Sequence, residues 1–407
     1  MDLKSGYPFW AVKNGLMCTF PQLKADISRD VVVVGGGITG ALIADELGNS
    51  GFDVVVVEQR DIGWGSSAAS TALLQYEIDT HMVDLAKMYG EVHAVLAYKA
   101  CADAITDLRD LANELGDVDF DMQESLYYAS KRKDKAALRE EYELRVKHDF
   151  DAQWLDSGSL KERFGIKRPG AILTRLAARV DPYRMASKLL LRLAERGGLI
   201  FDRTVIDTIE PSDGRVTLRT PDGFQIRAQH VVMAAGYASQ KWLKRSVAKN
   251  RSSYAFITDP IAKSDLGLLA STMVWESARP YLYMRTTGDG RLLVGGDDDD
   301  IDIPARRDKR VEGKAKGLYK KVKKLFPDLS MRPAFSWGGT FAETEDGLPF
   351  FGEHPQYGPR VQFAMAYGGN GISYSMIGAG LLRASIEGRQ HPLAALFGFS
   401  RKGQSQK

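Results

Sequence analysis

Residues 31–40 read VVVVGGGITG, and residues 54–58 read VVVVE. Each run of four valines is apolar, β-branched and about as long as a buried strand. The first run ends in Gly35-x-Gly37-x-x-Gly40, a spacing that permits a tight turn, close backbone approach to a pyrophosphate and close packing of helix on strand. The pattern predicts a strand, a glycine turn, a helix and a second strand in succession.

A helix is predicted from Ile38 to Leu47, because its apolar residues share one stripe and Gly51 stands where a C-terminal cap would end it. The N-terminus of such a helix offers N–H groups and partial positive charge to a pyrophosphate. Glu58 follows the turn by about twenty residues, where a carboxylate accepts the ribose hydroxyls of an adenosine. Together these features predict a dinucleotide-binding unit.

The stretch after Glu58, residues 59–71, reads QRDIGWGSSAAST and is rich in small and hydroxyl side chains. A nicotinamide cofactor has no general need for such a stretch directly after the ribose acid. A flavin does, because its ribityl chain and ring extend back across the fold and need close backbone approach and hydroxyl partners. FAD is therefore favoured. The segment from Gly63 to Ser67 resembles the G-x-G-x-S segment of the glycine/D-amino-acid oxidase family of FAD enzymes.

Two further blocks support the resemblance. A helix is predicted from Pro182 to Glu195 with Asp181 as its N-cap, and strands with turns at 213–214 and 221–223 follow it up to Ala235-Gly236. The last block is DGLPFFG at 346–352, followed by YGGNGI at 367–372, which opens a helix. In the family, this block is a second flavin-contacting motif. A helix N-terminus there would direct amides at the flavin edge that becomes negative on reduction.

The resemblance also implies that the backbone of Val205 contacts adenine and that the strand ending at Ala235 passes beside the FAD. The predicted cofactor residues are Gly35, Gly37, Ile38, Thr39, Gly40, Glu58, Gln59, Arg60, Ser66, Ser67, Ser70, Thr71, Val205, Ala235, Gly236, Gly352, Gly368, Gly369, Asn370, Gly371 and Ile372. Some family members attach FAD covalently through Cys or His. Because the post-ribose segment has no His, and no Cys lies beyond residue 101, noncovalent FAD is expected.

The fold class expected is α/β: a Rossmann-like FAD-binding domain, discontinuous in sequence, with a second α+β substrate domain of mixed sheet and helices. The chain of 407 residues is 44% hydrophobic, enough for a large core. The FAD domain is assigned to 28–84, 169–245 and 339–395, and the substrate domain to 85–168 and 246–338. Residues 1–27 are an N-terminal extension, and 396–407 are expected to be a loose tail.

Charge and metal-ligand patterns point to no further cofactor. Residues 305–326 carry ten Lys or Arg against two acids, which suits a solvated helix face or, alternatively, contact with an anionic membrane surface, with RNA or with an acidic electron acceptor. The acids at 297–300 and 302 lack the glycine and glutamate of a calcium loop and suit an exposed turn. Scattered histidines and only two cysteines, Cys18 and Cys101, give no metal spacing. A cytoplasmic location is expected.

The resemblance implies oxidation of the C–N bond of an amine or amino acid by hydride transfer to flavin N5, followed by imine hydrolysis. Orientation and electrostatic stabilisation suffice for this chemistry, so no catalytic acid or base is assigned. The electron acceptor is oxygen or another acceptor. The alternatives are an FAD-dependent RNA-modifying enzyme and a flavoprotein with other chemistry; nucleic acid is not the expected partner.

Amino-acid-oxidising family members commonly carry an Arg three residues after the position of Gly338, and it grips the substrate carboxylate. This chain has Phe341 at that position, and phenylalanine cannot bind a carboxylate. Either the substrate is an amine without an α-carboxylate, or another cation serves. Arg285, which follows Tyr283 on a predicted strand, is the candidate cation, and a strand-surface arginine is its alternative interpretation. Tyr283, Arg285 and Phe341 are therefore the candidate substrate residues, with the amine slightly preferred.

Overall fold

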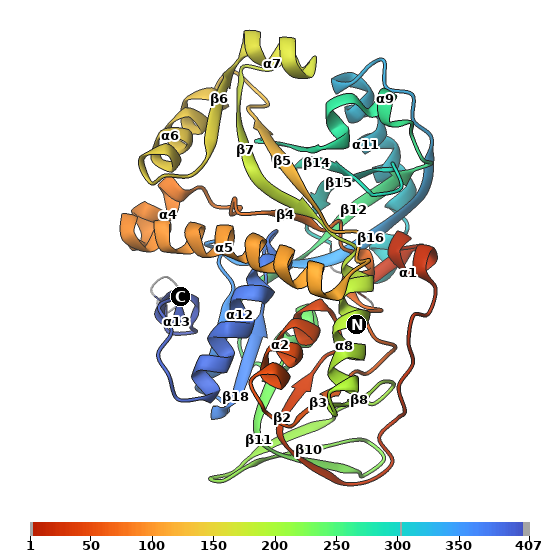
Figure 1. Cartoon of the computed structure of the whole chain (residues 1–407), viewed down its shortest axis with the longest axis vertical. Coiled ribbons are helices and arrows are strands. Elements are labelled where there is room, and N and C mark those ends of the chain that lie inside the picture. Colours follow the sequence, from red (N-terminus) through yellow and green to blue (C-terminus); the bar gives the residue numbers. More distant parts are fainter. Residues whose placement is uncertain (1–2, 302, 402–407) are drawn as a thin grey trace. The chain divides into compact units, whose positions relative to one another are not determined.

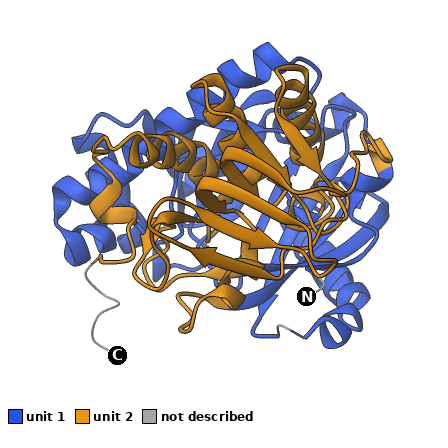
Figure 2. Cartoon of the chain, turned by 90° about the horizontal axis from the view of Figure 1, so that it is seen from below, with its two compact units in different colours: residues 1–12, 69–181, 250–341 blue, residues 13–68, 182–249, 342–407 orange. Residues whose placement is uncertain are grey.

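The computed structural model describes residues 3–301 and 303–401, which form two compact units (Figures 1 and 2). Unit 1 comprises 1–12, 69–181 and 250–341, and unit 2 comprises 13–68, 182–249 and 342–407. Each unit is thus assembled from three separate stretches of chain.

Unit 2 contains a sheet in the order β17-β18-β11-β2-β3-β8. Strands β18, β11, β2, β3 and β8 run parallel, and β17 is an antiparallel edge strand. Helix α2 packs on the helices α8 and α12 as well as on the sheet, as Figure 1 shows. The valines of β2 and β3 are buried and pair in register, Val31 with Val54 through Val34 with Val57. A parallel sheet covered by helices buries both of its faces, which explains these uninterrupted apolar runs.

The elements of unit 2 are β2 (Ile27–Val34), α2 (Ile38–Asn49), β3 (Val54–Val57), α3 (Ser66–Ala69, which ends in unit 1), α8 (Pro182–Glu195), β8 (Leu199–Phe201), β9 (Thr208–Pro211), β10 (Val216–Arg219), β11 (Gln225–Met233), η1 (Gly236–Trp242), β17 (Phe350–His354), β18 (Gly358–Met365), α12 (Gly371–Ile386) and α13 (Ala394–Phe397).

Unit 1 contains a second sheet, in the order β1-β16-β12-β15-β14-β13-β5-β7-β4, with β6 also paired to β7. Within it β13 and β5 run parallel, and the pairs β14–β15 and β5–β7 are antiparallel. One buried cluster of this unit joins Val274, Met284 and Val294 of the sheet to Leu318 and Val322 of α11. Because side chains alternate along a strand, Trp275, Tyr283 and Gly295, which are paired across β13, β14 and β15, face the other way.

The elements of unit 1 are β1 (Lys4–Gly6), α1 (Phe9–Asn14, which ends in unit 2), β4 (Leu73–Gln75), α4 (Met82–Tyr89), α5 (Glu91–Leu115), β5 (Asp121–Tyr128), α6 (Asp134–Lys147), β6 (Ala152–Asp156), α7 (Ser157–Phe164), β7 (Gly170–Arg179), β12 (Lys249–Thr258), α9 (Lys263–Leu266), η2 (Gly267–Ala270), β13 (Thr272–Glu276), β14 (Leu282–Thr286), β15 (Leu292–Asp299), α10 (Pro304–Asp308), α11 (Val311–Leu325) and β16 (Pro333–Glu343).

The unit boundaries differ from the domain boundaries predicted from the sequence. Residues 69–84 and 169–181, assigned to the FAD domain, lie in unit 1, and the N-terminal extension is divided between both units. β1 joins the sheet of unit 1 by pairing with β16, so residues 4–6 of the predicted extension are part of a sheet. The prediction of a loose tail is wrong for 396–401, because Phe397 and Arg401 are buried in unit 2. The rest of that prediction, 402–407, lies outside the described residues.

The basic stretch 305–326 forms α10 and α11. Leu318, Val322 and Leu325 are buried, as their spacing predicted. On α11, Lys314 and Lys321 pair with Asp297 of β15 at 3.4 and 3.2 Å between nitrogen and oxygen. These ion pairs neutralise part of the positive charge of α11 and part of the negative charge of the aspartates at 297–300 within unit 1. Asp302 lies outside the described residues. In the described part of the chain, no helix is long and apolar enough to cross a membrane.

Candidate functional site

Most of the predicted cofactor residues in unit 2 follow the carboxyl ends of parallel strands. The glycine turn follows β2, Glu58 follows β3, Ala235 and Gly236 follow β11, and residues 368–372 follow β18. Because parallel strands end at the same edge of a sheet, these four segments share one edge, where open α/β sheets bind their ligands. Gly352 differs, because it lies within the edge strand β17, opposite Phe363.

The turn between β2 and α2 requires glycine at two positions. Gly35 has a φ of +122°, and a Cβ there would overlap the carbonyl of Ala234 at the end of β11. A Cβ on Gly40 would overlap the carbonyl oxygen of Gly35, so the first turn of α2 lies directly against the loop. The loop amide of Gly35 donates to the Val57 carbonyl at 2.8 Å, which fixes the turn to β3.

Glu58 is held by the backbone on both sides. Its Oε2 accepts from the Gly36 amide at 2.8 Å, and its Oε1 accepts from the Arg60 amide at 2.9 Å. Burial raises the pKa of Glu58, and these amide hydrogen bonds oppose the rise. Each carboxylate oxygen keeps a second lone pair, so the group can still accept a ribose hydroxyl. The Thr204 amide donates to the Glu58 carbonyl at 2.8 Å, which brings the following Val205 to this edge of the sheet.

The hydroxyl-rich segment 66–71 begins at the N-terminus of α2. Ser67 Oγ accepts from the Ile38 amide at 2.8 Å, and Thr39 Oγ1 lies 2.8 Å from Ser375 Oγ of α12. The two helix N-termini that were predicted to contact FAD are therefore tied together through their side chains. Among the described residues, the buried Ser66 Oγ has no hydrogen-bond partner. A buried hydroxyl of this kind costs free energy unless a ligand satisfies it, so the segment fits a polar cofactor chain.

The DGLPFFG block is fixed by a residue that the sequence analysis missed. Arg401 is buried, and its Nε and one terminal nitrogen donate to the two oxygens of Asp346 at 2.8 and 2.9 Å. It also donates to the carbonyls of Leu348 and Pro349 and stacks over the Phe350 ring. No pattern near residue 401 indicated this role, because the backbone acceptors it uses carry no sequence signature.

The three candidate substrate residues lie in unit 1 and have different surroundings. Tyr283 and Arg285 share one face of β14, and Phe341, partly exposed, lies near the end of β16. The Tyr283 hydroxyl lies 3.2 Å from Ser253 Oγ, and its ring occupies the space that a side chain on Gly295 would fill. Burial raises the pKa of Tyr283, and the carboxylate of Asp298 adds to the rise, so the hydroxyl stays protonated at neutral pH.

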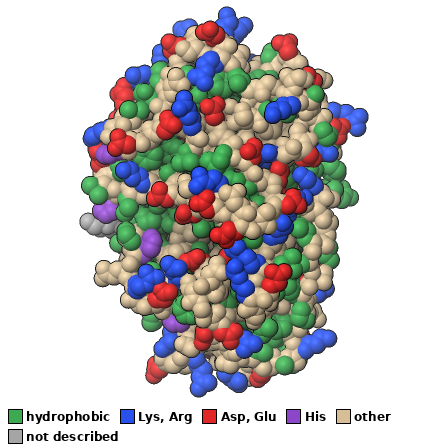
Figure 3. Space-filling model, in the orientation of Figure 1, with side chains coloured by type: hydrophobic (Ala, Val, Ile, Leu, Met, Phe, Trp, Pro, Cys, Tyr) green, Lys and Arg blue, Asp and Glu red, His purple; other side chains and the backbone are tan. Residues whose placement is uncertain are grey.

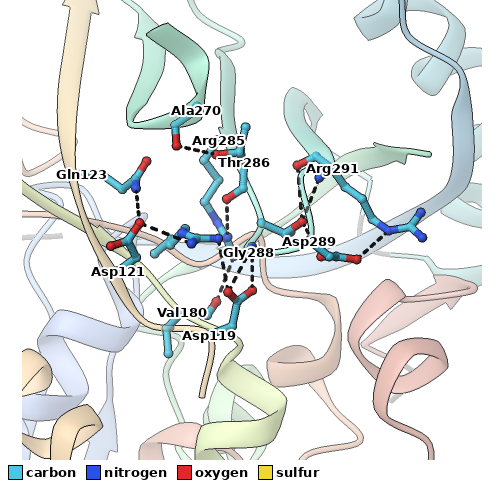
Figure 4. A network of polar contacts seen from close by, with 12 residues as sticks. Asp119, Asp121, Gln123, Val180, Ala270, Arg285, Thr286, Gly288, Asp289 and Arg291 are labelled. Carbon is cyan, nitrogen blue, oxygen red and sulfur yellow. Dashed lines mark hydrogen bonds and ion pairs between the residues drawn. The ribbon is translucent and has the colours of Figure 1, made fainter. Parts of the chain in front are cut away.

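Arg285 is fully buried, and each nitrogen of its guanidinium donates to a backbone carbonyl. The acceptors are Thr71 at 2.7 Å, Thr286 at 3.1 Å and Val180 at 2.9 Å, the last two visible in Figure 4. Burial lowers the pKa of Arg285 to about 9. This geometry agrees neither with the strand-surface interpretation nor with a guanidinium held ready for a carboxylate.

The comparisons with known proteins agree with this arrangement. A family described as "FAD dependent oxidoreductase" matches residues 30–384. The chain belongs to this family. The predicted family, fold class and FAD cofactor are therefore confirmed, and the protein is an FAD-dependent oxidoreductase.

Relatives cover nearly the whole chain. Gamma-glutamylputrescine oxidoreductase of Escherichia coli is 26% identical over 93% of this chain and 88% of its own length. Glycine oxidase of Geobacillus kaustophilus is 28% identical over 91% of this chain and 96% of its own length. The crystal structure of glycine oxidase from Geobacillus kaustophilus superimposes with a TM-score of 0.79 at 22% identity, covering 92% of this chain and 99% of that chain.

Proposed function

We propose that this FAD-dependent oxidoreductase oxidises the C–N bond of a small amine that has no carboxylate on the reacting carbon. The observation that carries the proposal is the lack of a suitable cation at either candidate position: residue 341 is Phe, and the guanidinium of Arg285 is already bound to three backbone carbonyls. Binding an α-carboxylate calls for a charge-assisted pair, for which arginine is the usual donor.

The charges around Tyr283 support the same substrate class. The carboxylates of Asp298 and Asp79 both raise the pKa of Tyr283, so negative charge lies near its hydroxyl. Negative charge beside this hydroxyl favours a cationic amine approaching from solvent over a carboxylate.

In the proposed reaction, the substrate loses a proton from nitrogen before the chemical step, and FAD supplies the hydride acceptor. The C–H bond breaks as the nitrogen lone pair forms the C=N bond, and water then hydrolyses the imine to a carbonyl compound and ammonia or an amine. The two electrons pass on to oxygen or another acceptor. Tyr283 can orient the substrate by donating a hydrogen bond, and Phe341 provides an apolar wall in place of a carboxylate-binding group.

The names of the relatives span both substrate classes. One is named for glycine and one for gamma-glutamylputrescine, so the family membership leaves an amino acid and an amine as candidates. No observation favours the RNA-modifying alternative. Lys and Arg are intermixed with Asp and Glu over the face shown in Figure 3. A cytoplasmic location stays a prediction from cysteine usage.

The test is anaerobic mixing of the purified yellow protein with a panel of amines and amino acids, following loss of the oxidised flavin band, and then admitting air. Amines should bleach the flavin, and the matching α-amino acids should not. Rapid recovery on exposure to air would identify oxygen as the acceptor. Faster bleaching by amino acids, or bleaching by no compound of either class, would contradict the proposal.

Replacing Phe341 tests the assignment of the substrate wall. Phe341→Arg introduces the missing guanidinium and should raise the specificity constant for an amino acid relative to its amine by about ten- to a hundredfold, the value of a charge-assisted contact. Phe341→Leu is the matched control, because it keeps an apolar wall and should preserve the amine preference. An unchanged ratio in Phe341→Arg would remove residue 341 from the substrate site.

A further inference from the structure

Three consecutive backbone carbonyls in unit 1 each accept a hydrogen bond from a different buried side chain. Trp337 Nε1 donates to Ala69 O at 2.8 Å, Trp10 Nε1 to Ser70 O at 2.7 Å, and Arg285 Nε to Thr71 O at 2.7 Å. Ala69 is the last residue of the four-residue helix α3, and residues 70 and 71 belong to no helix or strand. Buried side chains therefore satisfy carbonyls that a longer helix or a strand would satisfy with backbone N–H groups.

The three donors come from elements far apart in the sequence. Trp10 lies on α1, Arg285 on β14 and Trp337 on β16, and their exposed fractions are 0%, 0% and 1%. They also support one another: the Arg285 guanidinium lies 5.2 Å from the centre of the Trp10 ring, and β1 pairs Gly6 with Trp337. Residues 4–6 and the strand that carries Trp337 therefore belong to one sheet of unit 1.

Ordering Trp10 costs conformational freedom, which burial of its ring against Phe9 offsets. Burial alone does not require the indole N–H groups of Trp10 and Trp337 to be directed at neighbouring carbonyls of one segment. The segment so held contains Ser70 and Thr71, the two residues of unit 1 that the sequence assigned to the flavin. When all three carbonyls are hydrogen-bonded, the peptide planes of this segment are held in one orientation. The Cα–Cβ bonds of Ser70 and Thr71 then have fixed positions and directions.

We propose that Trp10, Trp337 and Arg285 are positioning residues of the cofactor site, which lock the 69–71 backbone in the conformation that receives the flavin half of FAD. The N-terminal segment 3–10 is then a working part of the cofactor site. It acts through residues 69–71 and need not touch the cofactor itself. This inference rests on the FAD assignment and is independent of the substrate, so it holds whether an amine or an amino acid is oxidised.

The two halves of the cofactor allow the role to be isolated. ADP carries only the adenosine and pyrophosphate, which were assigned to the Gly35–Gly40 turn and Glu58, whereas Ser70 and Thr71 were assigned to the part of FAD that ADP lacks. The full-length chain is freed of FAD, and its dissociation constants for FAD and for ADP are measured by titration. Trp10→Phe removes the N–H donor and keeps a ring. It should raise the FAD constant by about two- to tenfold, the size expected for one neutral hydrogen bond, and leave the ADP constant unchanged.

Two further variants make the result decisive. Trp337→Phe should produce the same selective loss of FAD affinity, and it serves as the test if Trp10→Phe does not fold. Trp154→Phe, which alters a half-buried tryptophan of the same unit, should change neither constant. Equal weakening of FAD and ADP would mean general damage to the fold, and an unchanged FAD constant in both indole variants would mean no role in the site. Either result would overturn the proposal.

Discussion

Removing the buried Arg401 should destabilise unit 2 strongly although the residue is only a few positions from the end of the chain. Its exposed fraction is 4%, it holds both oxygens of Asp346, and it donates to the carbonyls of Leu348 and Pro349. Arg401→Ala would leave the buried Asp346 carboxylate without its cation, although Asp346 Oδ1 still accepts from the Leu348 amide at 3.1 Å. Breaking a buried pair by removing one partner costs about 3–5 kcal/mol.

The assay is thermal and urea unfolding of Arg401→Ala beside Arg389→Ala. Arg389 pairs with Glu387 on the surface, with 53% of its side chain exposed, and such pairs contribute only about 0–1 kcal/mol. In a domain of this size each kcal/mol shifts the melting temperature by roughly 2–4 °C, so the Arg401→Ala transition should fall by about 6–20 °C. Arg401→Lys keeps the charge without the two parallel N–H groups, so its melting temperature should lie between those of wild type and Arg401→Ala. Equal small losses in the Ala variants would refute the idea that the C-terminal residues secure the DGLPFFG block.

Two other predictions concern the cofactor and pH. Glu58→Arg should be purified with little flavin, because the change removes the ribose acceptor and the partner of the Gly36 and Arg60 amides; normal flavin occupancy in this variant would contradict the ribose assignment. Wild-type protein should release intact FAD on heating or acidification, and flavin that stays on the denatured chain would contradict noncovalent binding. Glu77 is fully buried in unit 1, with the Arg145 guanidinium 3.5 Å from its carboxylate. Burial raises the pKa of Glu77 more than Arg145 lowers it, so its contribution to stability is present at low pH and is lost as pH rises above the ordinary range of a glutamate and through the folded value. Glu77→Gln should therefore flatten the fall of the urea midpoint with rising pH, and an unchanged slope would show that another group causes it.

Local structure was predictable where one pattern determined it. The helix from Pro182 to Glu195 has its predicted bounds, because the proline start, the amphipathic pattern and the glycines that follow all act within a few residues. The two valine strands and the glycine turn were predictable for the same reason. These features depend on neighbours in the sequence, so single-sequence reasoning could reach them.

The contacts that were missed join residues far apart in the chain. Trp10 and Ser70 are separated by 60 positions, and Arg401 and Asp346 by 55. In the first case the acceptor is a backbone carbonyl, which every residue possesses and no sequence pattern marks. Arg285 illustrates the same limit: its position on a strand was predictable, but the three carbonyls that occupy its guanidinium were not.

The interleaving of the two units has a consequence for synthesis on the ribosome. Val31 of β2 pairs with Val54 of β3 soon after both are made, but on its other side it pairs with His230 of β11. At about 5–20 residues per second, β11 emerges roughly 10–40 s later. During that interval a strand of four consecutive valines presents an open edge, which invites pairing with other chains. We therefore expect chaperones to protect the unpaired edge of β2 during synthesis. Expression at low temperature or with extra chaperone should raise the yield of folded protein, and the gain should exceed that seen for a domain formed by one continuous stretch of chain.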